Sequence, residues 1–200
     1  MKKDGRKLRS ESTTDHILNT AIRIAREGNI DNMSFNSIAK EAKIGTRTIF
    51  RHFKDQETLQ ENLDIKLGEE FSSAFAKINI EDNLEKRIEN LSTILIKLYS
   101  KNQNIIRWSL RNIWRDKNSR KNMFSWNKIL RSYVYSILPE ILEKKKPERE
   151  IIFECTSFIF FLRLKIVQSL SDDDIKEIFV LNTKKYCLLY TSPSPRDTMS

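Results

Sequence analysis

The stretch that decides the fold is SFNSIAKEAKIGTRTIFRHF, residues 34–53. Ser34, the first residue of this stretch, is a candidate N-cap, and residues 43–45 supply a tight turn. Between Ser34 and this turn, apolar residues recur at the spacing of one helix face: Phe35, Ile38, Ala39 and Ala42. After the turn, Ile49 and Phe53 lie four residues apart and predict a second short helix that points them inward. Two short helices joined by a tight turn are the pattern of a helix-turn-helix.

The second of these helices carries a basic face that does not suit a protein core. At 100° per residue, Arg47 and Arg51 lie opposite the two inward residues and one turn apart. Polar and aromatic side chains flank them: Thr46, Thr48, Phe50 and His52. Such a face is typical of a helix that enters the DNA major groove. The alternative is an ordinary solvated amphipathic helix.

Two further helices frame this motif. Ser12 and Asp15 fit a capping box, and a stripe of small and apolar residues then leads to Gly28: Ile17, Ala21, Ile24 and Ala25. This predicts a third helix, which can bury the apolar faces of the other two. Asp55 is a candidate N-cap of a fourth helix, with Glu57 in its first turn, where the helix dipole favours an anion.

Residues 12–65 resemble the N-terminal DNA-binding domain of TetR-family transcriptional regulators. The resemblance rests on TIFRHF at residues 48–53 followed by Glu57 and Leu59, and on IAKEA at residues 38–42. It implies a cytoplasmic bacterial regulator that binds an inverted-repeat operator as a homodimer, a repressor released by a small-molecule effector. The predicted DNA-binding residues are Ser34, Thr46, Arg47, Thr48, Phe50, Arg51, His52 and Lys54.

The sequence departs from the family pattern at particular positions. Phe50 stands where the family usually has a tyrosine whose hydroxyl contacts a phosphate, and Gln56 stands where it commonly has a lysine. Neither change removes the docking geometry, because phosphate contacts are shared among many groups. Arg47 occupies a position where the family often has a small residue or a proline. Two roles stay open for it: a bidentate contact with guanine, or neutralisation of a phosphate.

The net charge of +9 does not by itself point to nucleic acid, because the basic excess is spread along the chain. Residues 1–66 contain 13 basic and 10 acidic side chains, and residues 67–186 contain 22 and 16. The local arrangement is more informative. Several Lys and Arg precede the first helix, so residues 1–11 are expected to form a flexible basic arm that contacts phosphates or the minor groove. The alternative is a solvated, disordered terminus.

The whole chain is predicted to be all-α, with about nine helices in two domains. It has only four glycines and four prolines, and no stretch alternates with period two. A helix-turn-helix domain over 12–54 is followed by a larger helical domain over 55–187. Helical spacing predicts helices from Asp55 toward Ile78 and then over 83–100, 102–115, 119–138, 148–170 and from 172 onward. The helix over 148–170 is nearly apolar all round, which predicts burial on both sides.

The larger domain is expected to bind a ligand and to form the dimer. In the family, the last two helices build a dimer interface and the middle helices enclose a ligand pocket. The apolar run Ile151 to Leu162 needs a partner surface, which a second subunit or a monomeric core can supply. Candidate pocket residues are Tyr99, Trp108, Arg111, Trp114, Phe124, Trp126 and Phe158. Two alternatives stay open: these aromatics are plain core, or the domain recruits a protein partner instead of a small ligand.

Several function classes find no support in the sequence. No nucleophile–base pair, Gly-rich phosphate loop or carboxylate cluster indicates an enzyme. His16 and His52 are isolated, so neither a metal site nor a cofactor is expected. Cys155 and Cys187 are too few for a disulfide framework, which fits a reducing cytoplasm. The most apolar stretch, residues 151–170, contains three charged side chains, which argues against a membrane span.

Residues 188–200 differ abruptly in composition from the rest of the chain. Their Ser- and Pro-rich sequence resembles translated sequencing-adapter read-through at the end of an assembled reading frame. The alternative is a native disordered tail. The fold prediction does not use these residues.

Overall fold

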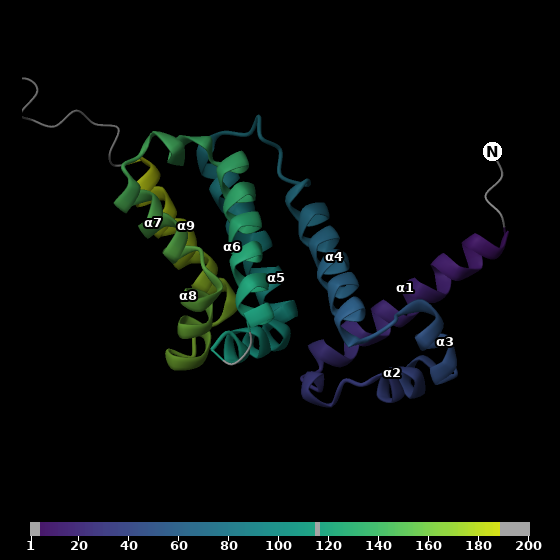
Figure 1. Cartoon of the computed structure of the whole chain (residues 1–200). Coiled ribbons are helices and arrows are strands. Elements are labelled where there is room, and N and C mark those ends of the chain that lie inside the picture. The colour runs from purple at the N-terminus through teal and green to yellow at the C-terminus, as the bar shows by residue number, and fades with distance from the viewer. Residues whose placement is uncertain (1–4, 115–116, 189–200) are drawn as a thin grey trace, which may run out of the picture. The chain divides into compact units, whose positions relative to one another are not determined.

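The structure is a computed structural model that describes residues 5–114 and 117–188. Within these ranges it contains nine α-helices, short 3-10 and π-helical segments, and no strand (Figure 1). The predicted all-α fold is therefore confirmed. Residues 1–4 of the predicted arm and residues 189–200 of the predicted tail lie outside the described residues.

The helices divide into two compact units. The first combines the chain up to Ser73 with Asn102–Asn112, and the second combines Ala74–Lys101 with the chain from Ile113 onward. The first unit contains α1 (Gly5–Arg26), η1 (Ile30–Asn32), α2 (Phe35–Ala42), α3 (Thr46–His52) and most of α4 (Gln56–Phe75). The second contains α6 (Lys117–Ile137), η2 (Pro139–Glu143), α7 (Lys146–Cys155), α8 (Phe158–Leu162), η3 (Arg163–Val167) and α9 (Asp172–Leu188). Helix α5 (Leu84–Asn112) contributes residues to both units. The predicted functional boundary after residue 54 remains a prediction.

Helix α1 begins earlier than predicted, so the start at Ser12 is wrong. The helix already includes residues 5–11, which were expected to belong to a flexible arm. This segment is rich in Lys, Arg, Leu and Glu, which favour helix, and it contains no proline. The hydroxyls of Thr13 and Thr14 donate to the carbonyls of Arg9 and Ser10, four residues back, as threonines inside a helix do.

The core of the first unit is built from the predicted stripes. All four residues of the α1 stripe are buried, as are those of α2, together with Ile49 and Phe53. Helix α4 buries one residue per turn: Leu59, Leu63, Leu67 and Phe71 belong to this unit, and Phe75 belongs to the second. The chain leaves α1 through Gly28, whose φ of +90° is a left-handed conformation that glycine adopts without steric cost.

Helix α5 is one continuous helix of 29 residues, where two helices were predicted over 83–100 and 102–115. Polar side chains at the predicted break bind other elements. Ser100 donates to Asp172, and Asn102 is buried and accepts a hydrogen bond from Arg26. Because these polar groups are satisfied by tertiary contacts, the helix does not need to end there.

The predicted helix over 148–170 is not continuous, which is a second correction. Helix α7 ends at Cys155, and Ser157 caps α8 by accepting a hydrogen bond from the Phe160 N–H. The Thr156 hydroxyl donates to carbonyls of the preceding turn, and its carbonyl accepts a hydrogen bond from Tyr99. The segment is also less buried than predicted, since several of its apolar side chains are exposed: Ile151, Ile159, Ile166 and Val167.

The second unit has an aromatic and aliphatic core. Tyr99 packs edge-on against Phe158, with 5.4 Å between ring centroids, and Phe161 lies beside both rings. Helices α7 and α9 pack against each other. Burial raises the pKa of the Cys187 thiol in α9 to about 11. None of the described helices combines the length and apolarity that crossing a membrane requires.

Candidate nucleic-acid interface

The helix-turn-helix is held by its own caps. Ser34 is the N-cap of α2: its hydroxyl accepts a hydrogen bond from the Ser37 N–H, and the Ser37 hydroxyl accepts one from the Ser34 N–H. Lys43 ends α2 in the left-handed conformation, with φ at +55°. Gly45, by contrast, has an extended backbone that any residue can adopt. The predicted turn is therefore confirmed, but its left-handed residue is the lysine.

Helix α3 presents the predicted basic face to solvent. Ile49 and Phe53 are fully buried beneath it, whereas Arg47 and Arg51 are exposed. Within the described part of the chain, neither arginine makes a hydrogen bond or an ion pair. Two cations one helical turn apart, without an internal partner, are available to an anionic ligand such as a phosphate backbone.

Some residues beside these arginines make contacts within the helix-turn-helix. The Thr46 hydroxyl donates to the Asn36 side-chain oxygen of α2 at 3.3 Å. Phe50 packs edge-on against Phe35, with 4.9 Å between centroids, yet remains 58% exposed. Thr48 is partly exposed and Lys54 is exposed. The predicted DNA-binding residues on α3 thus occupy its outer side and its two flanks.

His52 is tied to α1. Its Nδ1 lies 2.9 Å from the Thr14 hydroxyl oxygen, and its ring is only partly exposed. Sequence reasoning gave His52 a phosphate contact but missed this partner. Thr14 lies 38 residues earlier in the chain, and no local pattern links the two positions.

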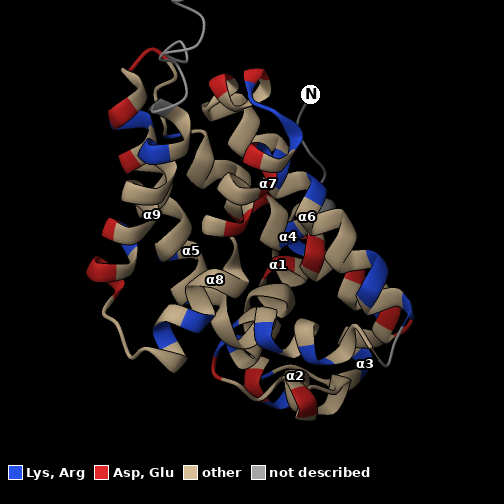
Figure 2. Ribbon diagram, turned by 90° about the vertical axis from the view of Figure 1, so that its left-hand side faces the viewer, with Lys and Arg blue, Asp and Glu red and all other residues tan. Residues whose placement is uncertain are grey.

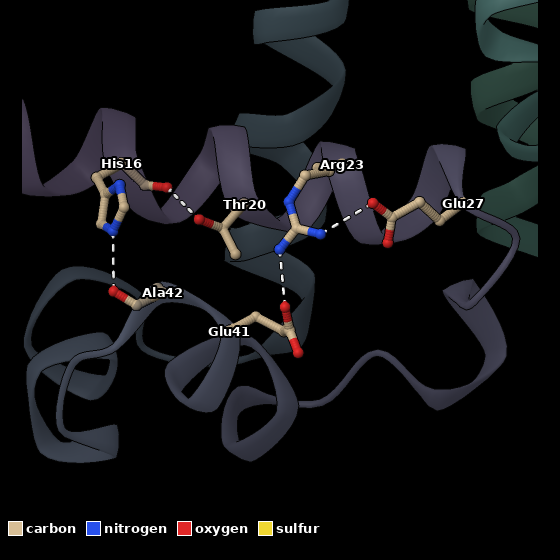
Figure 3. Close-up of polar contacts among 6 residues, drawn as sticks. All are labelled: His16, Thr20, Arg23, Glu27, Glu41 and Ala42. Carbon is tan, nitrogen blue, oxygen red and sulfur yellow. Dashed lines mark hydrogen bonds and ion pairs between the residues drawn. The ribbon is translucent and has the colours of Figure 1, made fainter.

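Helix α1 also holds α2 from one side (Figure 3). His16 Nε2 donates to the Ala42 carbonyl at the end of α2, and Arg23 bridges Glu27, just after α1, and Glu41 of α2. The Arg23 guanidinium lowers the pKa of the Glu41 carboxyl. These contacts fix the first helix of the motif on α1, so that α2 and α3 are presented by a rigid support.

The recognition helix leads directly into a capped α4. One Asp55 carboxylate oxygen accepts hydrogen bonds from the backbone N–H and the hydroxyl of Thr58, as predicted for an N-cap. These bonds lower the pKa of the Asp55 carboxyl, so the cap stays ionised at neutral pH. A charged cap also complements the positive end of the helix dipole.

The end of α5 binds the far end of α1, an arrangement that the sequence did not reveal. Arg26 contacts Asn102 and Glu70, and its carbonyl accepts a hydrogen bond from Asn104. Further along α5, Trp108 Nε1 and the Arg111 guanidinium donate hydrogen bonds to the carboxylate of Asp31 in η1.

The predicted pocket residues have different environments. Trp108 and Arg111 share the Asp31 carboxylate, while Tyr99 and Phe158 are buried in aromatic packing. Trp126 is partly exposed. Trp114 and Phe124 are 80% and 65% exposed, so these two do not line an enclosed cavity in this structure. Their apolar character suggested burial, but each lies on a surface-facing side of its segment.

A groove of about 530 Å³ lies between α1 and α4. Its lining is largely charged and includes none of the predicted pocket residues: Asn19, Ile22, Arg23, Arg26, Glu27, Lys66, Glu69, Glu70 and Ser73. Small-molecule pockets are mostly apolar, so this groove does not fit the expected effector site.

Charge on the remaining surface does not mark the interface. Lys and Arg occur on helices throughout the chain, and Asp and Glu occur on many of the same helices (Figure 2). Helix α6 alone carries five basic residues and no acidic one. The candidate interface is therefore distinguished by the exposed arginines of α3, which have no partner among the described residues, and by the architecture that presents them.

Comparisons with known proteins agree with this architecture. Residues 17–63 match the family model described as bacterial regulatory proteins, tetR family. No curated protein matches the sequence significantly.

Among solved structures, a TetR-family transcriptional regulator from Mesorhizobium loti is similar with a TM-score of 0.68 at 14% identity, over 90% of this chain and 98% of that one. A TetR-family regulator from Vibrio parahaemolyticus gives a TM-score of 0.58 at 22% identity, over 86% and 96%. The multidrug binding protein EbrR, complexed with imidazole, gives 0.60 at 14%, over 86% and 89%.

The family match covers α1 from Ile17, the helix-turn-helix and the first part of α4, which are the elements that present the arginines. The structural likeness extends the fold over most of the chain. Residues 17–63 thus form the N-terminal domain of the tetR family of bacterial regulatory proteins, and most of the chain has the fold of solved TetR-family regulators.

Proposed function

We propose that this regulator is a homodimeric repressor that binds an inverted-repeat operator and leaves it when a small-molecule effector binds the larger domain. The observation that carries operator binding is the outer face of α3, where Arg47 and Arg51 are exposed and unpaired within the described residues. One short helix reads only a few base pairs, so twofold symmetry doubles the contact. The proposed contacts are Ser34, Thr46, Arg47, Thr48, Phe50, Arg51, His52 and Lys54.

Dimerisation is supported by apolar side chains that the described structure leaves exposed at the C-terminal helices. Ile159, Ile166 and Val167 lie on and after α8, and Leu181 lies on α9; each is more than half exposed. Helices α8 and α9 both contact the π-helical segment between them, so these residues belong to neighbouring elements. A second copy of the chain would remove this apolar surface from water.

Release by an effector is supported by the fold that the chain shares with EbrR, which binds drugs. Drug-like small molecules are therefore the first effectors to test. The exposure of Trp114 and Phe124 favours one alternative, in which the larger domain uses these aromatics to recruit a protein partner. Release of operator DNA by a purified drug-like compound would support the small-molecule effector over the protein partner.

Operator binding is tested by selecting a preferred site from random DNA duplexes and measuring its affinity against salt. Phosphate contacts release counterions, so log affinity should fall linearly with log salt. If roughly six phosphates are engaged, the affinity should fall about a thousandfold or more between 50 and 200 mM salt. An affinity that does not change with salt would refute the proposal.

A further inference from the structure

The contact between His52 and Thr14 has hydrogen-bond roles that its neighbours determine. The Thr14 hydroxyl oxygen lies 2.9 Å from His52 Nδ1 and 3.1 Å from the Ser10 carbonyl oxygen. A carbonyl can only accept, and a threonine hydroxyl has a single proton. If that proton pointed at Nδ1, the two oxygens would face each other without a proton between them. Both contacts are attractive only when Thr14 donates to Ser10 and accepts from a proton on His52 Nδ1.

We infer that Thr14 is a positioning residue that keeps the proton of neutral His52 on Nδ1, so that His52 donates to a DNA phosphate only when its ring is protonated. In a neutral imidazole one nitrogen donates and the other accepts. With the proton on the side of α1, Nε2 carries a lone pair, which a phosphate oxygen repels. Protonation places a second N–H on Nε2 and adds a positive charge.

This inference rests on the proposed function, in which His52 contacts the DNA backbone. His52 ends α3, directly after the exposed Arg51, and its ring is partly exposed. Because Nδ1 is engaged by α1, Nε2 is the nitrogen left for an outside partner. Operator affinity should therefore depend on pH through this ring, and Thr14 should determine the size of that dependence.

Charged groups on the elements around His52 must be separated from this effect. On α1 they are Glu11, three residues before Thr14, and Asp15, directly after it; Asp15 binds Lys66. On its own helix they are Arg47 and Arg51, and ahead of α4 they are Lys54 and the cap Asp55. Measurements between about pH 6 and 8.5 lie above the usual titration range of carboxyl groups and below that of lysine and arginine.

The experiment measures operator affinity across this pH range at constant ionic strength. The wild-type chain should bind less tightly as pH rises, by at most about tenfold per pH unit for one linked proton. Thr14→Val keeps the shape but cannot accept from Nδ1, so the neutral ring can carry its proton on Nε2. This variant should lose most of the pH dependence and bind more tightly than wild type at pH 8.5. Thr14→Ser restores the acceptor and should restore the wild-type profile.

Two substitutions of His52 separate its nitrogens. The amide nitrogen of His52→Gln reaches about as far as Nε2, so this variant should bind without pH dependence and close to the wild-type affinity at pH 6. The amide of His52→Asn reaches only as far as Nδ1 and should bind about tenfold to a hundredfold more weakly at every pH. The matched control is Thr13→Val, because the Thr13 hydroxyl makes the same bond to a carbonyl four residues back, at 2.9 Å.

Nitrogen NMR of the two histidine rings in the DNA-free protein reads the tautomer directly. His16 is an internal reference of the opposite kind, since its Nε2 must carry the proton that it donates to the Ala42 carbonyl. His52 should be protonated on Nδ1 in the wild type and shift toward Nε2 in Thr14→Val. A proton on Nε2 in the wild type, or equal pH profiles for wild type and Thr14→Val, would overturn the inference while leaving operator binding intact. Absence of any operator binding would instead overturn the proposed function, and the NMR result would still decide the tautomer.

Discussion

The carboxylate of Asp31 accepts a hydrogen bond from the guanidinium of Arg111, which lies 80 residues further along the chain. Trp108 donates its indole N–H to the same carboxylate oxygen, at 2.9 Å. Asp31 sits in η1, between α1 and the helix-turn-helix. The end of α5 is thereby fastened to the segment that leads into the DNA-binding motif.

Replacing Asp31 by Asn should destabilise the first unit in a way that depends on pH. Arg111 first, and then Trp108, lower the pKa of the Asp31 carboxyl. A folded-state pKa below the unfolded one contributes stability above the ordinary aspartate range, and this contribution is lost as pH falls through the folded-state value. In urea unfolding, wild type should therefore exceed Asp31→Asn in stability at pH 7, and the difference should shrink below about pH 4. A difference that stays constant down to pH 3 would contradict this assignment.

Arg47→Ala should separate base reading from phosphate binding. A bidentate contact with guanine predicts a loss of about 1–3 kcal/mol confined to one base position, whereas a phosphate contact predicts uniform weakening and a smaller salt slope. Competition binding with single-base operator variants distinguishes the two outcomes. Arg107→Ala is the matched control, because Arg107 is exposed on α5 and makes no hydrogen bond or ion pair in the described part of the chain. Equal effects from both variants would show that Arg47 has no special role.

The buried stripes were predictable because periodicity repeats in every turn. Ile17 and Ala21 on α1, and Leu59 and Leu63 on α4, each indicate a face without knowledge of the partner helix. The same spacing places Arg47 opposite Ile49, so the exposed side of α3 follows from the sequence as well.

Contacts between distant segments were not predictable from these patterns. A helix break was predicted between Ser100 and Asn102, but their side chains bind Asp172 and Arg26, 72 and 76 residues away, and α5 continues through them. The Thr14–His52 contact was missed for the same reason. The Thr156 hydroxyl bonds to carbonyls of the preceding turn, where α7 ends. The spacing of apolar residues does not predict this helix end.

Arg87 should be essential to the stability of the second unit. This buried side chain donates to the Ile137 carbonyl at the end of α6, contacts the Glu140 carboxylate of η2, and donates to the Asp82 carbonyl at 3.0 Å. Arg87→Met removes the charge and leaves these acceptors without a donor, which should cost about 2–4 kcal/mol. Denaturant unfolding measures the loss. Lys86→Met is the neighbouring control, since Lys86 is exposed and its one ion pair among the described residues is with Asp82, four residues earlier; a comparable loss there would refute the role of Arg87.

Ile159→Lys should weaken the dimer without unfolding the chain. The side chain is 57% exposed on α8, so a lysine fits the monomer, but a charge buried between two copies is costly. Light scattering at micromolar concentration should give a dimer mass for wild type and a monomer mass for the variant. Ile80→Lys, at a position that is 62% exposed outside α7 to α9, should remain a dimer. A wild-type monomer that persists at high concentration would defeat the dimer proposal itself.

Effector control, in the proposed repressor, should act through α4. Asp55 caps this helix directly after the recognition helix, and near its other end Phe75 stacks on Tyr133 of α6, with 4.7 Å between centroids. The sequence suggested α4 as the only continuous link between the two domains, but α5 also has residues in both units. An effector can shift the DNA-binding equilibrium only by its differential affinity for the two states. Because half-sites lie about 34–36 Å apart, a movement of a few ångströms at each α3 would prevent simultaneous docking.

Spin labels at position 47 of both subunits measure this movement. The Arg47→Cys label site is combined with Cys155→Ser, while Cys187 can stay, since it is buried and its thiol pKa of about 11 keeps it unreactive at neutral pH. A compound that releases operator DNA should change the distance between the labels. Phe75→Ala, which removes the stacking on Tyr133, should reduce that change while the compound still binds; Phe124→Ala, at an exposed aromatic of α6, should not. If the compound releases DNA while the distance stays unchanged, α4 does not carry the signal, and the effector must act by covering the recognition helices or by changing their flexibility.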